Sequence, residues 1–296
     1  MPQASSTIES IPRYTLQPTD NVELSRLVNM KGDWIVYFHH PTSAWKWSVS
    51  YVLKHGFPKD ERFLSWLLSK TKEEANTILQ ETGSRGTKVH AAIRDLIDGK
   101  KIEFGREYRG EKTGAYEKLM EDEWDCLLAF QRWCAIFNPK VNARETAVWH
   151  SDFAGTLDFS GTITIPAETK VWIDDKKVSF PRKKTIKVLL DWKTGGGIWD
   201  EHKIANAFYD LASGEHHQAT GVVRFGTKHV QGWEMELWSK KRTKEHLQNW
   251  NATVQNFHLK VKPFSYQEEL LPLTIAINIP IIEKKGKEVK NADSPM

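Results

Sequence analysis

The chain has 296 residues, of which 40% are hydrophobic, and its 42 basic and 38 acidic residues give a net charge of +4. This charge is too small to indicate a partner, and no apolar run reaches the roughly 18 residues needed to span a membrane. Cys126 and Cys134 lie about 12 Å apart along a predicted helix, too far for a disulfide bond. Without a secretory signal pattern near Met1, these features predict a soluble intracellular protein.

The first half of the predicted chain is mainly helical. Residues 1–20 are polar and are expected to be disordered, whereas residues 21–139 are expected to carry strands at 34–39 and 47–53. Apolar spacing predicts helices over residues 60–69, 71–79, 84–99 and 117–137. Thr71 opens the second helix with a capping box, and Gly83 is expected to end it.

Beyond Pro139 the apolar period changes to two, which is typical of strands. Strands are predicted over residues 143–149, 153–165, 168–173, 177–180, 186–192, 220–225 and 232–237. Helices are predicted over residues 200–211, with Asp200 as N-cap, and 243–259. We therefore expect an α/β fold whose mixed central sheet is flanked by helices, with an N-terminal helical region and an inserted basic hairpin. One domain would cover residues 21–282, with a sheet core at 140–240, a C-terminal helix and strand at 241–282, and a disordered tail at 283–296.

Two acidic residues on predicted strands carry the chemistry. Asp158 lies within one strand, and Asp191 ends the apolar run at 186–190, with Lys193 two residues later on the same face. Carboxylates at adjacent strand ends suit a hard divalent cation, for which the backbone carbonyl of Trp192 is a third candidate ligand. A lysine beside such a cation can hold the water or the phosphate in phosphodiester hydrolysis. An isolated acid-x-Lys sequence usually lies on a solvated surface, so the neighbouring motifs decide its meaning.

Four segments resemble one family in their type and order. They are RGTKVH at residues 85–90, Glu145, GTLD at 155–158 and DWKTG at 191–195; residues 47–53 also resemble an upstream segment. Together they resemble the RecB-like nucleases of the PD-(D/E)xK superfamily, in the phage and mitochondrial genome maintenance exonuclease branch. The resemblance covers roughly residues 45–240.

The resemblance implies a restriction-endonuclease-like core and a metal-dependent deoxyribonuclease. It implies that His90, Asp158 and Asp191 bind one or two Mg²⁺ or Mn²⁺ ions and that Lys193 positions the attacking water. Glu145 would bind a second ion or orient a water, with Tyr209 assisting, although a salt bridge for Glu145 and core packing for Tyr209 are equally open. Two cysteines cannot build the iron–sulfur cluster of some relatives.

Several residues are candidates for contacting DNA. They are Arg85, Lys88, Thr194, Lys176, Lys177, Arg182, Lys183 and Lys184. Trp45 and Trp199 could stack on a base. His216 and His217 are not grouped with other predicted metal ligands and are assigned no role. The expected partners are single-stranded DNA or DNA ends, and a single-strand-binding or recombination protein, with no membrane. The expected location is the cytoplasm of a bacterial or phage-infected cell, or the mitochondrion of a eukaryote.

One position departs from the family pattern. The family places a glutamine four residues before the tyrosine that aligns with Tyr209, and this chain has Ala205 there. Asn206 is adjacent but lies about 100° around the helix. This departure keeps open the alternative of a DNA-binding recombination accessory protein whose site has decayed. A restriction-type endonuclease stays open as a separate alternative within the nuclease class.

Overall fold

The computed structural model describes residues 10–29, 34–110, 115–266 and 270–272. The chain divides into two units, of which the smaller contains residues 1–13 and 268–296. Within it, β1 (Ser10–Pro12) pairs antiparallel with β15 (Leu270–Pro272). The expectation of disorder over residues 1–20 is wrong for residues 10–18, which form β1 and β2, and residues 283–296 lie outside the described residues. The features below belong to the larger unit, Tyr14–Gln267.

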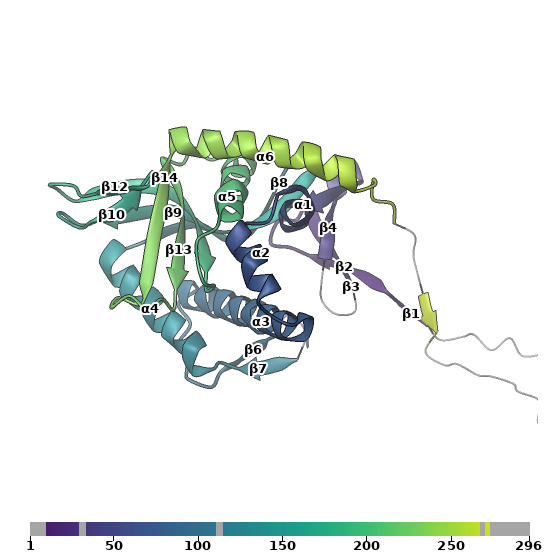
Figure 1. Cartoon of the computed structure of the whole chain (residues 1–296), viewed down its shortest axis with the longest axis horizontal. Helices are drawn as coiled ribbons and strands as arrows, with labels where there is room; N and C mark the ends of the chain where they lie inside the picture. The colour runs from purple at the N-terminus through teal and green to yellow at the C-terminus, as the bar shows by residue number, and fades with distance from the viewer. Residues whose placement is uncertain (1–9, 30–33, 111–114, 267–269, 273–296) are drawn as a thin grey trace, which may run out of the picture. The chain divides into compact units, whose positions relative to one another are not determined.

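A mixed sheet of 11 strands is the framework of the larger unit (Figure 1). Its strands are β2 (Tyr14–Pro18), β3 (Leu24–Asn29), β4 (Trp34–His39), β5 (Ala44–Ser48), β8 (Lys140–His150), β9 (Phe153–Ile165), β10 (Val171–Ile173), β11 (Lys176–Val178), β12 (Lys184–Lys193), β13 (Ala219–Phe225) and β14 (Trp233–Ser239). They run in the order β11-β10-β14-β13-β12-β9-β5-β4-β3-β2, with β8 also paired to β9. A separate short ladder joins β6 (Glu107–Arg109) to β7 (Tyr116–Lys118).

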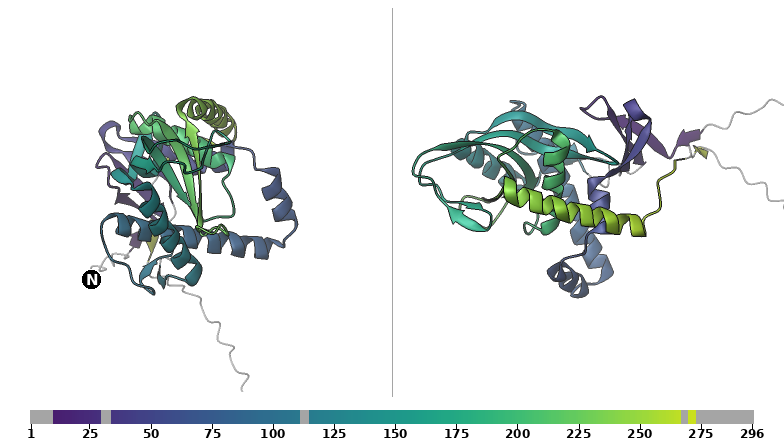
Figure 2. Two further views of the ribbon diagram at one scale, coloured as in Figure 1. Left: turned by 90° about the vertical axis from the view of Figure 1, so that its left-hand side faces the viewer. Right: turned by 90° about the horizontal axis from the view of Figure 1, so that it is seen from above.

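Helices cover both faces of this sheet (Figure 2). They are α1 (Val49–Gly56), α2 (Glu61–Leu68), α3 (Lys72–Ile97), α4 (Glu121–Phe137), α5 (Asp200–Ser213) and α6 (Lys240–Lys260). α3 and α4 bury Val89 and Trp133 against Trp192 in the largest core cluster. α1, α5 and α6 form a second cluster with the start of β9, around Phe208 and Trp250. This arrangement confirms the expected α/β class with a mixed sheet between helices.

Local structure departs from the sequence expectations in three places. Residues 47–53 are not one strand, because Ser48 ends β5 and accepts a hydrogen bond from the Tyr51 N–H (3.2 Å) to start α1. The Thr71 capping box is confirmed, but α3 continues through Gly83 to Ile97. Residues 21–139 also hold more strands than expected, because β3 extends the sheet beside the expected β4, and β6 and β7 form a separate ladder. In the part of the chain that is described, no helix is both long and apolar enough to cross a bilayer.

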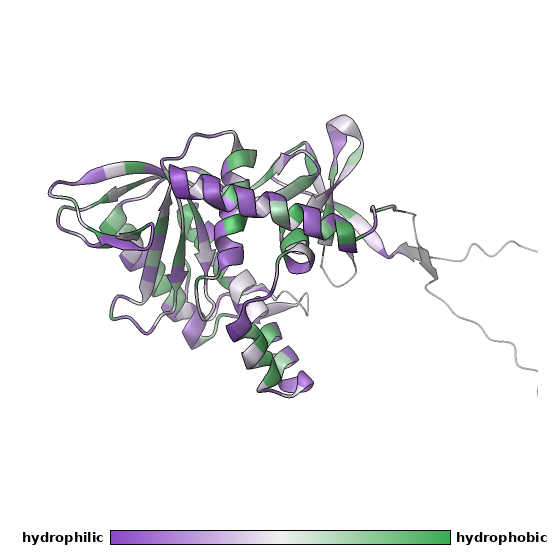
Figure 3. Ribbon diagram, turned by 45° about the horizontal axis from the view of Figure 1, so that its top comes forward, coloured by the Kyte–Doolittle hydropathy of each residue, from purple (hydrophilic) through white to green (hydrophobic). Residues whose placement is uncertain are grey.

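Two helical segments form an arm at the side of the sheet, which we call the α2–α3 arm (residues 61–83). None of the α2 residues is buried, and Leu68 is 88% exposed. Figure 3 shows apolar residues along this projecting pair of segments. Only the second half of α3 packs into the core, through residues such as Ala92 and Ile93.

A break in strand pairing creates the opening for a site. One edge of β9 pairs with β8 along much of its length. On the other edge, β5 pairs with Phe153 and Ala154, and β12 pairs only from Phe159 onward. The GTLD segment, residues 155–158, lies between these two pairings, so its side chains lie where β5 and β12 diverge.

Candidate metal centre

Three side chains from three elements meet at this break. His90 from α3, Glu145 from β8 and Asp158 from β9 place their ligand atoms within 4.8 Å of one another. His90 Nδ1 is 3.4 Å from Asp158 Oδ1 and 3.5 Å from Glu145 Oε1. On the other side of the ring, Nε2 lies 2.9 Å from the carbonyl oxygen of Trp192. We call these three residues the His/Glu/Asp cluster.

Strand register explains why the acids align. Continuing the β8–β9 pairs on either side sets Glu145 opposite Asp158. Continuing the β9–β12 register past Leu190 and Phe159 sets Asp191 opposite Asp158 as well. Glu145 has a φ of 46°, a left-handed conformation that non-glycine residues rarely adopt. The backbone is therefore strained at a residue that faces the cluster, as is common at functional sites.

Asp191 and Lys193 lie beside the cluster and are paired with each other. Lys193 Nζ is 2.5 Å from Asp191 Oδ2. Asp158 Oδ2 accepts the Trp192 N–H at 2.7 Å, where the backbone ladder between β9 and β12 has ended. Of the four predicted metal ligands, His90 and Asp158 therefore lie together in the cluster. The Trp192 carbonyl contacts the other side of the His90 ring, and Asp191 forms an ion pair with Lys193.

Opposite charges at this centre shift one another's pKa values. Burial lowers the pKa of His90, but the charge of Asp158 and hydrogen bonds to Asp158 and Glu145 hold that pKa well above its ordinary value. Burial also lowers the pKa of Lys193, but the charges of Asp191, Asp158 and Glu145, with the hydrogen bond to Asp191, together raise that pKa above its ordinary value. Burial raises the pKa of Asp191, with Lys193 opposing the shift. The acids therefore favour the protonated forms of His90 and Lys193.

A wide cleft gives access to the cluster. It has a volume of about 1450 Å³, and His90, Glu145 and Lys193 line it together with residues of the α2–α3 arm. Glycines 195–197 form part of its wall, and a Cβ added at Gly195 or Gly196 would meet no atom within 4 Å. The cluster is therefore open to a large substrate.

His202, in the first turn of α5, is a cleft residue that the sequence analysis missed. Burial lowers its pKa to about 3, and the positive charge of Lys193 acts in the same direction. Its Nδ1 accepts the N–H of Trp199 at 3.2 Å, which leaves the ring proton on Nε2. His202 is thus a neutral hydrogen-bond donor in the wall of the cleft. The sequence gives no signal for it, because a histidine in a first helical turn is unremarkable.

Lys88 is the clearest error among the predicted DNA contacts. Its side chain is buried, with Nζ 2.8 Å from Glu123 and 3.5 Å from Glu117, so it joins α3 to α4 and cannot reach a phosphate. Arg85 donates to the carbonyl oxygen of Thr194 at 2.6 Å and pairs with Asp122. Arg85 and Thr194 also line a second cavity of about 470 Å³ beside the glycine loop.

The basic hairpin residues lie away from the cluster. The basic residues Lys176, Lys177, Arg182, Lys183 and Lys184 are exposed, on β11, in the connection that follows it and at the start of β12. Because β12 has 10 residues, Lys184 is about 30 Å from Lys193 at the usual strand rise. A phosphate held at the cluster would be out of their reach. They remain candidates only for distant DNA contacts.

Helix α5 offers no amide at the position where the family has glutamine. Ala205 packs into the apolar cluster of α1, α5 and α6. Asn206 is fully buried and donates to the carbonyl of Gly221 at 3.0 Å, so it faces β13. Tyr209 packs against Gly155, where an added Cβ would come within 2.6 Å of the ring. Core packing is therefore a role of Tyr209 that the contacts show directly.

The two candidate stacking tryptophans have different surroundings. Trp199 lines the cleft, and the Arg62 guanidinium lies 5.0 Å from its ring centroid. Trp45 instead packs edge-on against Phe38 and Phe264. Only Trp199 is therefore placed to meet a ligand in the cleft.

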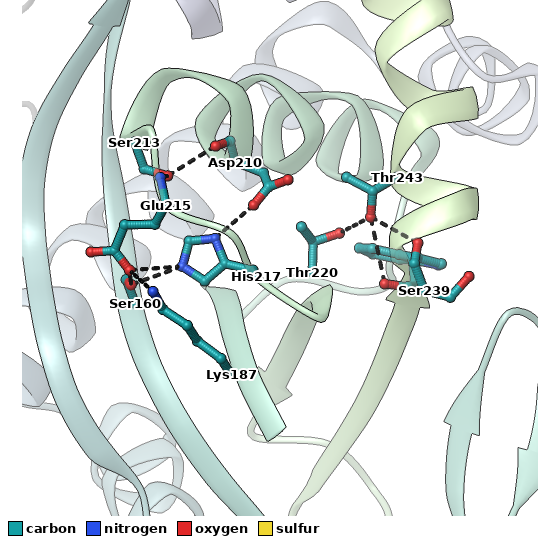
Figure 4. A network of polar contacts seen from close by, with 10 residues as sticks. Ser160, Lys187, Asp210, Ser213, Glu215, His217, Thr220, Ser239 and Thr243 are labelled. Carbon is teal, nitrogen blue, oxygen red and sulfur yellow. Dashed lines mark hydrogen bonds and ion pairs between the residues drawn. The ribbon is translucent and has the colours of Figure 1, made fainter. Parts of the chain in front are cut away.

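A second polar network is built from β9, β12 and the end of α5 (Figure 4). Ser160 Oγ lies 2.9 Å from His217 Nε2, and His217 Nδ1 lies 2.6 Å from Asp210 Oδ1. Glu215 accepts hydrogen bonds from Ser160 (3.0 Å) and Lys187 (2.9 Å). The serine, histidine and aspartate have the order of a hydrolytic triad, but Ser160 is 1% exposed and no substrate reaches it. We call this set the Ser160–His217 network.

A scan against protein-family models found no match to this chain, and a search of curated proteins found no match either.

Proposed function

We propose that this chain is a Mg²⁺- or Mn²⁺-dependent deoxyribonuclease of the RecB-like PD-(D/E)xK type, with a restriction-endonuclease-like core. Within that class we propose an exonuclease that acts on single-stranded DNA or DNA ends. The observation that carries the proposal is the convergence of His90, Glu145 and Asp158 in an open cleft, with the Asp191–Lys193 pair alongside. The sequence resemblance of the same residues supports it independently.

The donor set suits a divalent cation. One imidazole and two carboxylates, with Asp191 next to them, supply the oxygen-rich ligands that Mg²⁺ and Mn²⁺ accept. The same carboxylates raise the pKa of His90, so they favour positive charge at this point, and a bound cation would displace the proton from His90 Nδ1. A cation bound here would offset negative charge on a scissile phosphate and lower the pKa of a bound water.

Lys193 is the residue placed to handle the nucleophile. Its ammonium, fixed by Asp191, can donate hydrogen bonds to an attacking water or to a phosphate oxygen in the cleft. In-line attack forms the new oxygen–phosphorus bond, breaks the bond to the 3′-oxygen and passes a proton to that oxygen. The product polarity implied by the resemblance is a 5′-phosphate.

The direct test is degradation of labelled DNA by the full chain. Single-stranded, duplex and closed circular substrates are compared with Mg²⁺, with Mn²⁺ and with EDTA, for the native chain and for Asp191→Asn. We expect metal-dependent loss of single strands or of DNA with free ends, and none with the variant. Discrete cuts in closed circles would replace the exonuclease proposal with an endonuclease.

One observation favours a different function. Because α5 supplies neither a glutamine at Ala205 nor an amide from Asn206 to the cleft, the chain could bind DNA as a recombination accessory protein without cutting it. Tight DNA binding with no cleavage in either metal ion would establish that alternative.

A further inference from the structure

We infer that the cleft binds a single DNA strand by stacking its bases at two aromatic–cation stations, one on each side of the His/Glu/Asp cluster. The first, the helix station, consists of Arg62, Phe63 and Trp66 of α2 with Trp199. The second, the strand station, consists of Arg26 and Trp34. This inference rests on the proposed nuclease function and specifies which residues hold the substrate.

The helix station is a set of rings on an otherwise uncovered helix. The rings of Phe63 and Trp66 are stacked, with centroids 5.7 Å apart and an interplanar angle of 28°. Arg62 lies over Trp199, and all four residues line the cleft. Since α2 has no buried residue, packing within the described chain does not account for these rings. Aromatic faces next to guanidinium groups are the usual platform for unpaired bases.

The strand station is attached to the strand that carries Asp158. Arg26 lies over the Trp34 ring, with its Cζ 4.5 Å from the centroid. The same guanidinium donates to Thr156 Oγ1 at 2.7 Å, and Thr156 precedes Asp158 by two residues in β9. Trp34 is 38% exposed, and both station residues line the cleft. A ring and a cation are thus fixed close to the cluster.

The break in the β9 pairing sets the two stations apart. The strand station belongs to β3 and β4, which lie beyond β5 and hence beyond residues 153–154 of β9. Trp199 follows the glycine loop that leaves β12, which pairs with β9 from Phe159 onward. Asp158 lies between these two pairings, so a strand crossing the cluster meets one station before it and one after it.

The occupant that fits these features is an unpaired nucleic-acid strand. In a duplex the base faces are covered by their neighbours, whereas a single strand leaves them free to stack on tryptophan. An apolar α2 face alone would also suit a protein helix. The guanidinium groups beside the rings, and the continuity of the same cleft with Lys193, favour a ligand with both bases and phosphates.

The experiment measures binding without cleavage. Full-length chain in EDTA is titrated against a labelled oligothymidine and against an oligonucleotide of equal length made of abasic sites. We expect Trp66→Ala and Trp34→Ala each to weaken oligothymidine binding about tenfold, with abasic binding unchanged. Trp66→Phe and Trp34→Phe should retain most of the affinity. Trp172→Ala is the matched control, because Trp172 is 48% exposed on β10 and does not line the cleft.

Three outcomes would overturn the inference. The first is an oligothymidine affinity that does not change in folded Trp→Ala variants. The second is an equal loss of affinity for the abasic strand in these variants. The third is tighter binding of duplex DNA than of single-stranded DNA by the native chain. If an alanine variant does not fold, as judged by circular dichroism, two other measurements test the inference. They are the oligothymidine affinity of the phenylalanine variant and the native chain's preference for oligothymidine over the abasic strand. Because binding is measured without metal, stacking without later cleavage would refute only the nuclease proposal. Cleavage without stacking would refute only the stations.

Discussion

The His/Glu/Asp cluster and the Ser160–His217 network use the same kinds of side chain for different ends. Both join a histidine to carboxylates, and Asp158 and Ser160 are two residues apart on β9. The His217 side chain is completely buried, whereas a quarter of the His90 side chain is exposed to a wide cleft. Access to a large ligand, and not the presence of a histidine–acid pair, therefore distinguishes the candidate site from a structural network.

The largest expected effect comes from the two β9 residues themselves. Asp158→Asn removes a charge from the cluster but keeps an acceptor for the Trp192 N–H, so we expect cleavage to fall about 10³-fold or more, roughly 4 kcal/mol of transition-state stabilisation. Ser160→Ala removes hydrogen bonds to Glu215 and His217 and should cost about 1–3 kcal/mol of stability with cleavage retained. Initial cleavage rates and urea unfolding measure both quantities.

Crossed results would break the comparison. If Ser160→Ala abolished cleavage while the chain stayed folded, the buried network would be catalytic and the assignment of the cluster would be wrong. Full activity of Asp158→Asn in Mg²⁺ and Mn²⁺ would also mean that the assignment of the cluster is wrong.

A second pair of variants compares two lysines on β12. Lys193 pairs with Asp191 in the cleft, and Lys187 pairs with Glu215 in the Ser160–His217 network. Replacing Lys193 with Met keeps the side-chain length but removes the donor beside the cluster, and we expect about 10²–10⁴-fold slower cleavage. The same change at Lys187 removes an ion pair whose side chains are 33% and 32% exposed. Such a pair is worth about 1 kcal/mol or less, so cleavage should stay within about twofold.

These lysine variants are compared at equal folded fraction by single-turnover cleavage. Equal losses of activity would mean that Lys193 acts through the fold, as Lys187 does. An added primary amine that restores activity to Lys193→Met but not to Lys187→Met would strengthen the chemical role.

The sequence patterns predicted the elements that have strong local signals. The bounds of β4 and β9 match the expected ranges, and the Thr71 capping box begins α3. Each is decided by nearby residues: runs rich in β-branched and aromatic residues in the strands, and a threonine with a glutamate three residues later. The motif residues His90, Glu145 and Asp158 converge although they come from separate elements.

Features that depend on distant contacts were not predictable in this way. Gly83 was expected to end a helix, but the second half of α3 is held by packing on α4 and the helix continues through it. Lys88 was predicted to contact DNA because its ion-pair partner, Glu123, lies on another helix. The sequence does not show that these two residues are close in the fold. The place of Glu145 opposite Asp158 also requires a register shift between Val141 and Ala143, for which the sequence has no signal.

The smallest expected effect concerns His202, which sharpens the comparison within the cleft. The glutamine in His202→Gln retains an N–H donor, so this variant should cleave at close to the native rate. The cleavage rate of His202→Ala should be about tenfold lower, the order expected for one hydrogen bond to a charged group. His246→Gln is the control, because His246 lies on α6 and does not line the cleft. Equal activity of the His202→Ala and native chains would remove His202 from the substrate contacts.

Acid stability gives His202 a second readout. Its folded pKa of about 3 lies below the ordinary value of 6.5, so between these values the unfolded chain binds a proton that the folded chain does not. Stability therefore falls as pH drops from about 6.5 toward 3, and is unaffected by this group above that range. Burial lowers the pKa of His246 as well. Both glutamine variants should then melt with a weaker pH dependence than the native chain between pH of about 6.5 and 4. A slope unchanged in His202→Gln would mean that its imidazole is solvated, and its assignment as a fixed neutral donor would fail.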